Sequence, residues 1–126
     1  MKVLIVDDSH LLQTRLKDAL RKVDVNMIIS QAVNCKEALE LFPHFSPDKV
    51  VLDISLPDGS GINLLQEFKK YDPSIHVIMF TNYPTDEFKN CCLELGADGF
   101  FDKSNILGLM ETIGLQNKIS NKNLTE

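Results

Sequence analysis

Five side chains that could act together on a phosphoryl group follow short apolar segments of this sequence. Asp7 and Asp8 come directly after one apolar run and Asp53 after another, while Thr81 and Lys103 follow two later runs. If the three carboxylates meet, they repel, because two unit charges at ~4 Å cost about 4 kcal/mol at an effective dielectric of ~20. One lysine cannot neutralise three carboxylates, so one of them takes up a proton or a divalent cation binds. A site built only of oxygen ligands favours Mg²⁺ or Mn²⁺, and such a metal in turn clamps a phosphoryl group.

The segments that would position these residues alternate between two periodicities. The predicted strands are apolar runs rich in β-branched residues: Lys2 to Val6, Met27 to Ala32, Lys49 to Leu52, His76 to Phe80 and Gly99 to Phe101. Each is followed by apolar residues at helical spacing, namely Leu12-Leu16-Ala19-Leu20-Val23, Cys35-Ala38-Leu39-Phe42, Gly61-Leu64-Leu65-Phe68, Phe88-Cys91-Cys92-Leu95 and Ile106-Leu109-Met110-Ile113. The alternation predicts an α/β fold, a doubly wound five-stranded parallel sheet with helices on both faces.

Boundary residues support the five predicted helices. The expected N-caps are Ser9, Asn34, Ser60, Thr85 and Ser104. Gly96 is placed to end the fourth helix. From about Gln116 the chain turns polar, which is typical of a tail or a linker.

Composition excludes several classes of protein. The 126 residues are 44% hydrophobic and 25% charged, which is typical of one globular domain. A net charge of −5 argues against direct nucleic-acid binding by this region. The apolar runs are too short to span a membrane and no signal-peptide pattern is present, so we expect a cytoplasmic protein. Cys35, Cys91 and Cys92 lack ligand spacing, and we expect them to be small core residues.

In an open α/β sheet, ligands bind beyond the carboxyl ends of the strands, where the strand order reverses. Asp7, Asp8, Asp53, Thr81 and Lys103 all follow predicted strand ends. If the first and third strands are neighbours, these side chains surround a single pocket.

Four segments of the sequence resemble the signature blocks of the receiver domains of two-component response regulators. They are Val3-Leu4-Ile5-Val6-Asp7-Asp8, Val51-Leu52-Asp53-Ile54-Ser55-Leu56-Pro57-Asp58-Gly59-Ser60-Gly61, Phe80-Thr81 and Gly96-Ala97-Asp98-Gly99-Phe100-Phe101-Asp102-Lys103. The blocks stand in family order and spacing from Lys2 to about Ile113. The resemblance implies a flavodoxin-like (βα)5 fold with strand order 2-1-3-4-5. It also implies a receiver domain over residues 1–116, with residues 117–126 as a polar tail or the start of a linker.

The resemblance also implies a role for each site residue. Asp53 is the phosphoacceptor, and it receives its phosphoryl group from the phosphohistidine of a sensor histidine kinase or a phosphotransfer protein. Asp8 and Asp53 bind Mg²⁺ or Mn²⁺ directly, Asp7 binds it through water, and Ser55 contributes its backbone carbonyl. Thr81 donates its hydroxyl to a phosphoryl oxygen, and Lys103 pairs with another.

The same resemblance implies that the aromatic residue Phe100 changes its orientation as part of a conformational switch. Phe100 turns inward when Thr81 moves, which repacks the surface of the fourth helix, fifth strand and fifth helix. That surface controls a downstream effector protein or an output domain of the same chain, or supports a homodimer formed on phosphorylation. The domain is then a phosphoacceptor that assists its own phosphorylation and dephosphorylation, and is not otherwise an enzyme.

Two positions depart from the family pattern. Asn82 stands where the family usually has a small residue, and Ser104 stands where it commonly has proline. Without proline, the Lys103–Ser104 bond is expected to be trans. Ser55 and Tyr83 are expected to flank the acceptor, and Asn82 and Tyr83 are expected to slow both loading and hydrolysis. Alternatively, Asn82 donates a hydrogen bond to the phosphoryl group and speeds loading.

Other interpretations of the same residues stay open at this point. The aspartates could cap helices, Thr81 and Lys103 could be ordinary turn and surface residues, and Phe100 could be plain core. A pseudo-receiver would only bind a partner protein. A phosphohydrolase with an aspartate nucleophile would generally need a second aspartate two residues later, where Ser55 stands. A flavodoxin-type cofactor site would require a Ser/Thr/Gly-rich phosphate loop after the first strand. The chain has Asp7 and Asp8 there, which would repel a phosphate unless a metal intervened.

Overall fold

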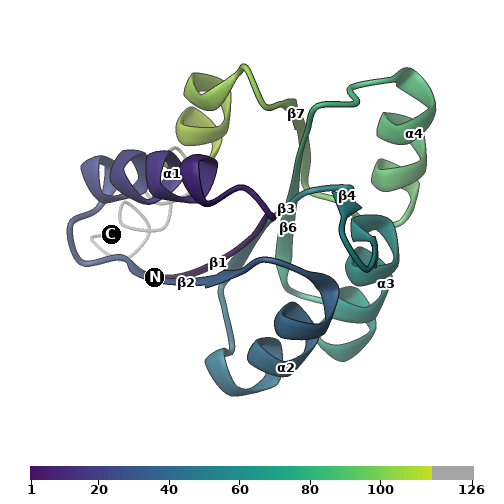
Figure 1. The fold of residues 1–126 in the computed structure, drawn as a ribbon, viewed down its shortest axis with the longest axis horizontal. Helices are drawn as coiled ribbons and strands as arrows, with labels where there is room; N and C mark the ends of the chain where they lie inside the picture. The colour runs from purple at the N-terminus through teal and green to yellow at the C-terminus, as the bar shows by residue number, and fades with distance from the viewer. Residues whose placement is uncertain (115–126) are drawn as a thin grey trace, which may run out of the picture.

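A computed structural model describes residues 1–114 and consists of one parallel sheet between two layers of helices (Figure 1). The sheet is made of β1 Lys2–Val6, β2 Ile28–Ala32, β3 Lys49–Leu52, β6 His76–Thr81 and β7 Gly99–Asp102, in the order β2-β1-β3-β6-β7. Counted along the chain, these strands have the predicted order 2-1-3-4-5. The tail predicted at residues 117–126 lies outside the described residues.

The helices divide between the two faces of the sheet. They are α1 His10–Val23, α2 Cys35–Phe45, α3 Gly61–Tyr71, α4 Asp86–Glu94 and a last helix over residues 106–114. The hydrophobic core on one face includes Leu16 of α1 and Leu109 of the last helix, and the core on the other includes Phe42 of α2, Phe68 of α3 and Cys92 of α4. Both faces of the sheet are therefore covered, as the sequence pattern predicted.

Residues of the central strands alternate between the two cores. In β1, Val3 and Ile5 face the core of α1 and the last helix, while Leu4 and Val6 face the core of α2, α3 and α4. All four are at most 1% exposed. Burial on both faces explains why the strands are continuous apolar runs instead of alternating polar and apolar residues.

Four of the five predicted N-caps are confirmed. The side chains of Ser9, Asn34, Ser60 and Thr85 accept hydrogen bonds from the N–H groups of Leu12, Glu37, Ile62 and Phe88. The prediction for Ser104 is wrong by one position, because Ser104 N–H donates to Asp102 in the preceding turn and Asn105 caps the helix by accepting from Gly108 N–H. Gly96, with a φ of +99°, follows α4 as predicted.

Other predicted boundaries and burials differ from the structure. Met27 is buried but precedes β2, because its N–H donates to the Asp24 carbonyl in a turn. Leu39 and Cys91 were predicted to be buried and are exposed, since the helices that carry them bury narrower stripes than the spacing suggests. Cys92 is buried as predicted, and Cys35 is half-buried at the start of α2.

A two-stranded hairpin follows Asp53. Its strands are β4 Ser55–Leu56 and β5 Gly59–Ser60, paired antiparallel between β3 and α3. Leu56 is 8% exposed and anchors the hairpin in the core. The hairpin places Ser55 directly beside the end of β3.

Two further observations concern the described residues as a whole. The Lys103–Ser104 bond is trans, as are all peptide bonds that the structure describes. None of the helices within residues 1–114 has the length and apolar character that crossing a bilayer requires.

Candidate functional site

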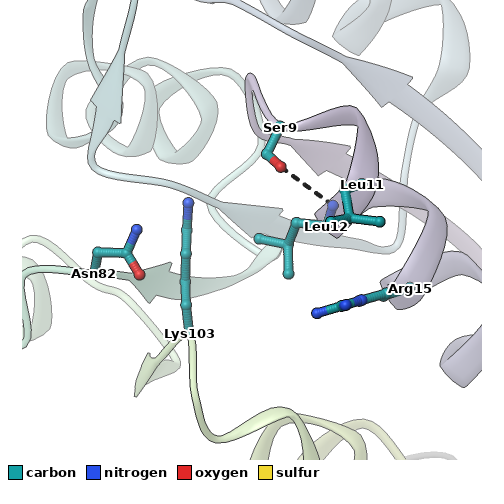
Figure 2. A pocket seen from close by; sticks show the side chains of 6 residues that line it. All are labelled: Ser9, Leu11, Leu12, Arg15, Asn82 and Lys103. Carbon is teal, nitrogen blue, oxygen red and sulfur yellow. Dashed lines mark hydrogen bonds between the residues drawn. The ribbon is translucent and has the colours of Figure 1, made fainter.

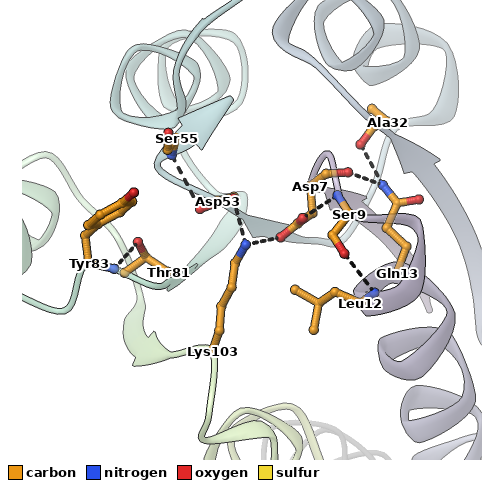
Figure 3. Close-up of polar contacts among 10 residues, drawn as sticks. All are labelled: Asp7, Ser9, Leu12, Gln13, Ala32, Asp53, Ser55, Thr81, Tyr83 and Lys103. Atoms are coloured by element: carbon orange, nitrogen blue, oxygen red, sulfur yellow. Dashed lines mark hydrogen bonds and ion pairs between the residues drawn. The ribbon is translucent and has the colours of Figure 1, made fainter. Parts of the chain in front are cut away.

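The carboxyl ends of four adjacent strands bring the predicted site residues together (Figure 3). Asp7 follows β1, Asp53 follows β3, Thr81 ends β6 and Lys103 follows β7. The sheet ladder continues into these positions, because Asp53 N–H donates to the Val6 carbonyl at 3.0 Å and Lys103 N–H to the Thr81 carbonyl at 2.9 Å. The backbone therefore fixes where each side chain starts.

Lys103 bridges two of the aspartates. Its Nζ lies 2.8 Å from Asp7 Oδ2 and 2.8 Å from Asp53 Oδ2. Asp7 is 2% exposed and Asp53 is 4% exposed, so each carboxylate depends on this ammonium group for charge compensation. The alternative in which Lys103 is an ordinary surface residue is wrong.

The third carboxylate, Asp8, adds to the excess negative charge of the cluster. Asp7, Asp8 and Asp53 each offer an oxygen, and these oxygens lie within 4.8 Å of one another. Asp8 is exposed, and the ion pairs of Lys103 go to the other two aspartates. Convergent carboxylate oxygens with one open side fit a hard divalent cation that keeps several waters, as Mg²⁺ and Mn²⁺ do.

Burial and neighbouring charges shift the pKa values of Asp53 and Lys103. Burial raises the pKa of Asp53 above its usual value; Lys103 opposes the shift, and Asp7 adds to it. Burial by itself would lower the pKa of Lys103, but its bonds to Asp53 and Asp7 outweigh that effect and raise the pKa. Protons therefore compete with any cation for Asp53, so cation binding should weaken as the pH falls through the pKa of Asp53.

Gln13 holds the Asp7 backbone in place and was missed by the sequence analysis. Its buried Nε2 donates to the Asp7 carbonyl at 2.5 Å and to the Ala32 carbonyl at 2.9 Å, tying the end of β1 to the end of β2. The signal was present, because Gln13, Leu16 and Leu20 share one buried stripe of α1. An amide in such a stripe needs hydrogen-bond partners, and here they are backbone carbonyls at the site.

Thr81 is oriented by the backbone two residues later. The side chain is fully buried, and its Oγ1 accepts a hydrogen bond from Tyr83 N–H at 3.0 Å (Figure 3). This accepted hydrogen bond leaves the hydroxyl hydrogen of Thr81 free to be donated to another group, because a hydroxyl can both donate and accept. Thr81 can thus donate to an anion bound next to Asp53.

The residues after Thr81 border the site on two sides. Asn82 and Lys103 line a pocket of about 220 Å³ together with Ser9, Leu12 and other residues of α1 (Figure 2). Tyr83 and Ser55 line a second pocket of about 320 Å³ between the hairpin and α4. That these residues flank the phosphoryl group and affect its transfer stays a prediction.

The backbone conformation around Asp53 also requires that residue 61 has no side chain, as in Gly61. Gly61 N–H donates to the Ile54 carbonyl at 2.7 Å. A Cβ on Gly61 would lie 1.8 Å from the Asp53 carbonyl oxygen, which no side chain could tolerate. Only glycine lets the start of α3 approach the Asp53 backbone this closely.

Phe100 lies inside β7, whereas Lys103 follows the end of that strand. It pairs in register with Met79 of β6 and packs, half-buried, against the core of α2, α3 and α4. This position is compatible with plain core and with a switch, so its switching role stays a prediction.

Comparisons with known proteins agree on one family. The profile described as response regulator receiver domain matches residues 3–113. The chain is 34% identical to the chemotaxis protein CheY of Halobacterium salinarum over 102 residues, which cover 81% of this chain and 83% of CheY. It is 32% identical to the DNA-binding transcriptional activator DevR/DosR of Mycobacterium tuberculosis, of which it covers 48%. The crystal structure of a CheY-like receiver domain protein from Methanospirillum hungatei is similar with a TM-score of 0.85 and 28% identity over 97% of both chains.

Proposed function

The chain belongs to the response regulator receiver family, and from that membership we propose that it is a cytoplasmic phosphorylation switch whose phosphoryl group is carried on Asp53. The donor is the phosphohistidine of a sensor histidine kinase or a phosphotransfer protein. The observation that carries this proposal is the buried Asp53 carboxylate with Lys103 Nζ at 2.8 Å, at the same sheet edge as the Thr81 hydroxyl. The catalytic residues are then Asp53, Thr81 and Lys103.

A divalent cation belongs to this proposal. Asp8 and Asp53 would hold Mg²⁺ or Mn²⁺ directly, Asp7 would hold it through water, and the Ser55 carbonyl would complete the ligands from the protein. When bound, the cation supplies positive charge to the phosphoryl oxygens. The convergence of the three carboxylates supports this assignment.

The chain's own residues position the transfer. One Asp53 oxygen attacks phosphorus while the bond from phosphorus to the donor nitrogen breaks and the nitrogen keeps the electron pair. Lys103 then pairs with a phosphoryl oxygen, and Thr81 donates its hydroxyl hydrogen to another. Lys103 is already held at the acceptor by its bonds to Asp7 and Asp53, so little reorganisation is needed.

The output would travel through Thr81 to Phe100. Movement of Thr81 toward the phosphoryl group opens space that Phe100 fills, and the surface of α4, β7 and the last helix repacks. The recipient is an effector protein or an output domain in the same chain, with a phosphorylation-dependent homodimer as one form of output. The relatives include both a chain of similar length and one about twice as long, which supports either arrangement.

The deciding experiment is the intact mass of the protein after incubation with acetyl phosphate and Mg²⁺. A gain of one phosphoryl group is expected. No gain would favour a pseudo-receiver that only binds a partner, and sustained release of phosphate would favour a phosphohydrolase. Ser55 stands where the acid/base aspartate of such a hydrolase would be, which argues against turnover.

Asp8→Ala should weaken Mg²⁺ binding and stabilise the metal-free fold. Asp8 is the exposed carboxylate of the cluster and has no ion pair with Lys103, so its removal relieves repulsion. We expect the metal-free free energy of unfolding to rise by about 0.5–1 kcal/mol, the scale of an exposed charge interaction. Calorimetric titration with Mg²⁺ and urea unfolding in EDTA measure the two effects. Unchanged Mg²⁺ affinity would remove Asp8 from the proposed ligands.

Asn82→Ala tests whether this side chain obstructs or assists transfer. Because Asn82 borders the same pocket as Lys103, its removal should widen the approach to Asp53 and speed both loading and decay. Loading by acetyl phosphate and decay after donor removal are followed by intact mass. Slower loading in the variant would contradict obstruction and show that Asn82 donates a hydrogen bond to the phosphoryl group instead.

A further inference from the structure

The tip of the β4–β5 hairpin is bound to the first turn of α2 by a single carboxylate. Asp58 Oδ1 accepts a hydrogen bond from Cys35 N–H at 2.7 Å, and its Oδ2 accepts one from Lys36 N–H at 3.1 Å. These residues are 23 and 22 positions away along the chain. The contact therefore joins the loop after the acceptor to a helix that carries no proposed site residue.

This contact completes the hydrogen bonding at the start of α2. Helices leave their first N–H groups without partners inside the helix. In α2, Asp58 accepts from Cys35 and Lys36, Asn34 Oδ1 accepts from Glu37, and the Asn34 carbonyl accepts from Ala38. The bond from Cys35 N–H is the main reason that the pKa of Asp58 lies below its usual value, so the carboxylate is charged at neutral pH. A negative charge is also favoured at this end of a helix.

The hairpin that Asp58 holds also carries Ser55. Ser55 pairs with Ser60 across the hairpin, and its N–H donates to Asp53 Oδ1 at 3.4 Å. The hairpin packs closely against α2, because a Cβ on Gly59 would lie 3.2 Å from Cys35 Sγ. A shift of the hairpin away from α2 would therefore move Ser55 relative to Asp53.

We propose that Asp58 is a positioning residue, which anchors the hairpin to α2 and thereby holds the Ser55 carbonyl where it can bind Mg²⁺ with Asp53. This inference rests on the proposed function of the carboxylate cluster. Asp58 touches neither the cation nor the phosphoryl group. Asp58 affects the affinity for the cation because it determines the position of the Ser55 carbonyl, which is a backbone ligand.

The test compares Mg²⁺ affinity in Asp58→Ala, Asp58→Asn and a matched control, by titration with Mg²⁺ alone followed by ¹H–¹⁵N NMR. Loss of a supporting partner typically weakens metal binding at least about tenfold, and we expect that loss in the alanine variant. The asparagine variant keeps one accepting oxygen and should lie between it and the wild type. The control is Asp72→Ala, which removes a carboxylate bonded to Ser74 in the turn before β6, at the opposite end of the sheet. It should bind Mg²⁺ like the wild type.

Amide exchange at Cys35 and Lys36 gives a readout that is independent of the metal. Both amides should exchange faster in the alanine variant, at least one of them in the asparagine variant, and neither in the control. Wild-type Mg²⁺ affinity in an Asp58 variant with faster exchange would overturn the proposal; if the alanine variant does not fold, the asparagine variant decides on the same terms. Failure of the proposed function looks different, because the wild type itself would then not bind Mg²⁺ through Asp53.

Discussion

Asp53→Asn is expected to abolish phosphorylation by acetyl phosphate while the fold is retained. An amide is a poor nucleophile, and the substitution keeps the shape of the side chain. Asp53 is buried and compensated by Lys103, which keeps its second partner Asp7 in the variant. The backbone bond from Asp53 N–H to the Val6 carbonyl is also unaffected. Intact mass should therefore show no added phosphoryl group, and the circular dichroism spectrum should match that of the wild type.

The matched control for this variant is Asp102→Asn. Asp102 ends β7 next to the site, and its side chain accepts from Ser104 N–H, which an asparagine oxygen can also do. The control should load normally. Peptide mapping that found an acid-labile phosphoryl group on any other residue would overturn the assignment of Asp53.

Lys103→Met is expected to cause the largest loss of stability among these variants. It removes the ammonium group that bridges Asp7 and Asp53, which are 2% and 4% exposed. Breaking a buried ion pair by removing one partner typically costs about 3–5 kcal/mol, because a buried charge loses its compensation. Urea unfolding in EDTA should show this loss, whereas Lys89→Met, at an exposed position of α4, should unfold like the wild type.

Mg²⁺ should restore much of the stability that Lys103→Met loses. A ligand that binds only the folded protein stabilises it by an amount that increases with its affinity and concentration, and the variant has more uncompensated negative charge at the site. The midpoint of unfolding should therefore rise more with Mg²⁺ in the variant than in the wild type. Equal responses of the two proteins would mean that the cation does not bind at these carboxylates.

Local sequence patterns were sufficient to predict the strands and the polar residues at their carboxyl ends. Strands buried on both faces are continuous apolar runs, so their positions were predicted to within a few residues. Their polar end residues then had to meet at one edge of the sheet. The resemblance to receivers supplied the strand order, and with it the neighbours of Asp53.

The features that sequence analysis missed depend on contacts between distant segments. The partners of Asp58 lie 22 and 23 positions away on α2, so no local pattern identifies them, and the buried stripe of α1 indicates that Gln13 needs partners without naming the Ala32 carbonyl. Helix caps have a local pattern, but adjacent candidates compete, and Asn105 rather than Ser104 caps the last helix because of a bond in the preceding turn. Exposure of Leu39 depends on how closely neighbouring helices approach, which spacing alone does not encode.

The close approach at Gly61 also affects how a mutational scan of this protein would be interpreted. Any side chain there collides with the Asp53 carbonyl oxygen, so every substitution should be as damaging in a survival assay as the loss of Asp53 itself. The two positions would receive equal scores for unrelated reasons. Cellular abundance distinguishes them: Asp53→Asn should accumulate as an inactive protein, whereas Gly61 variants should be degraded before their activity can be assessed.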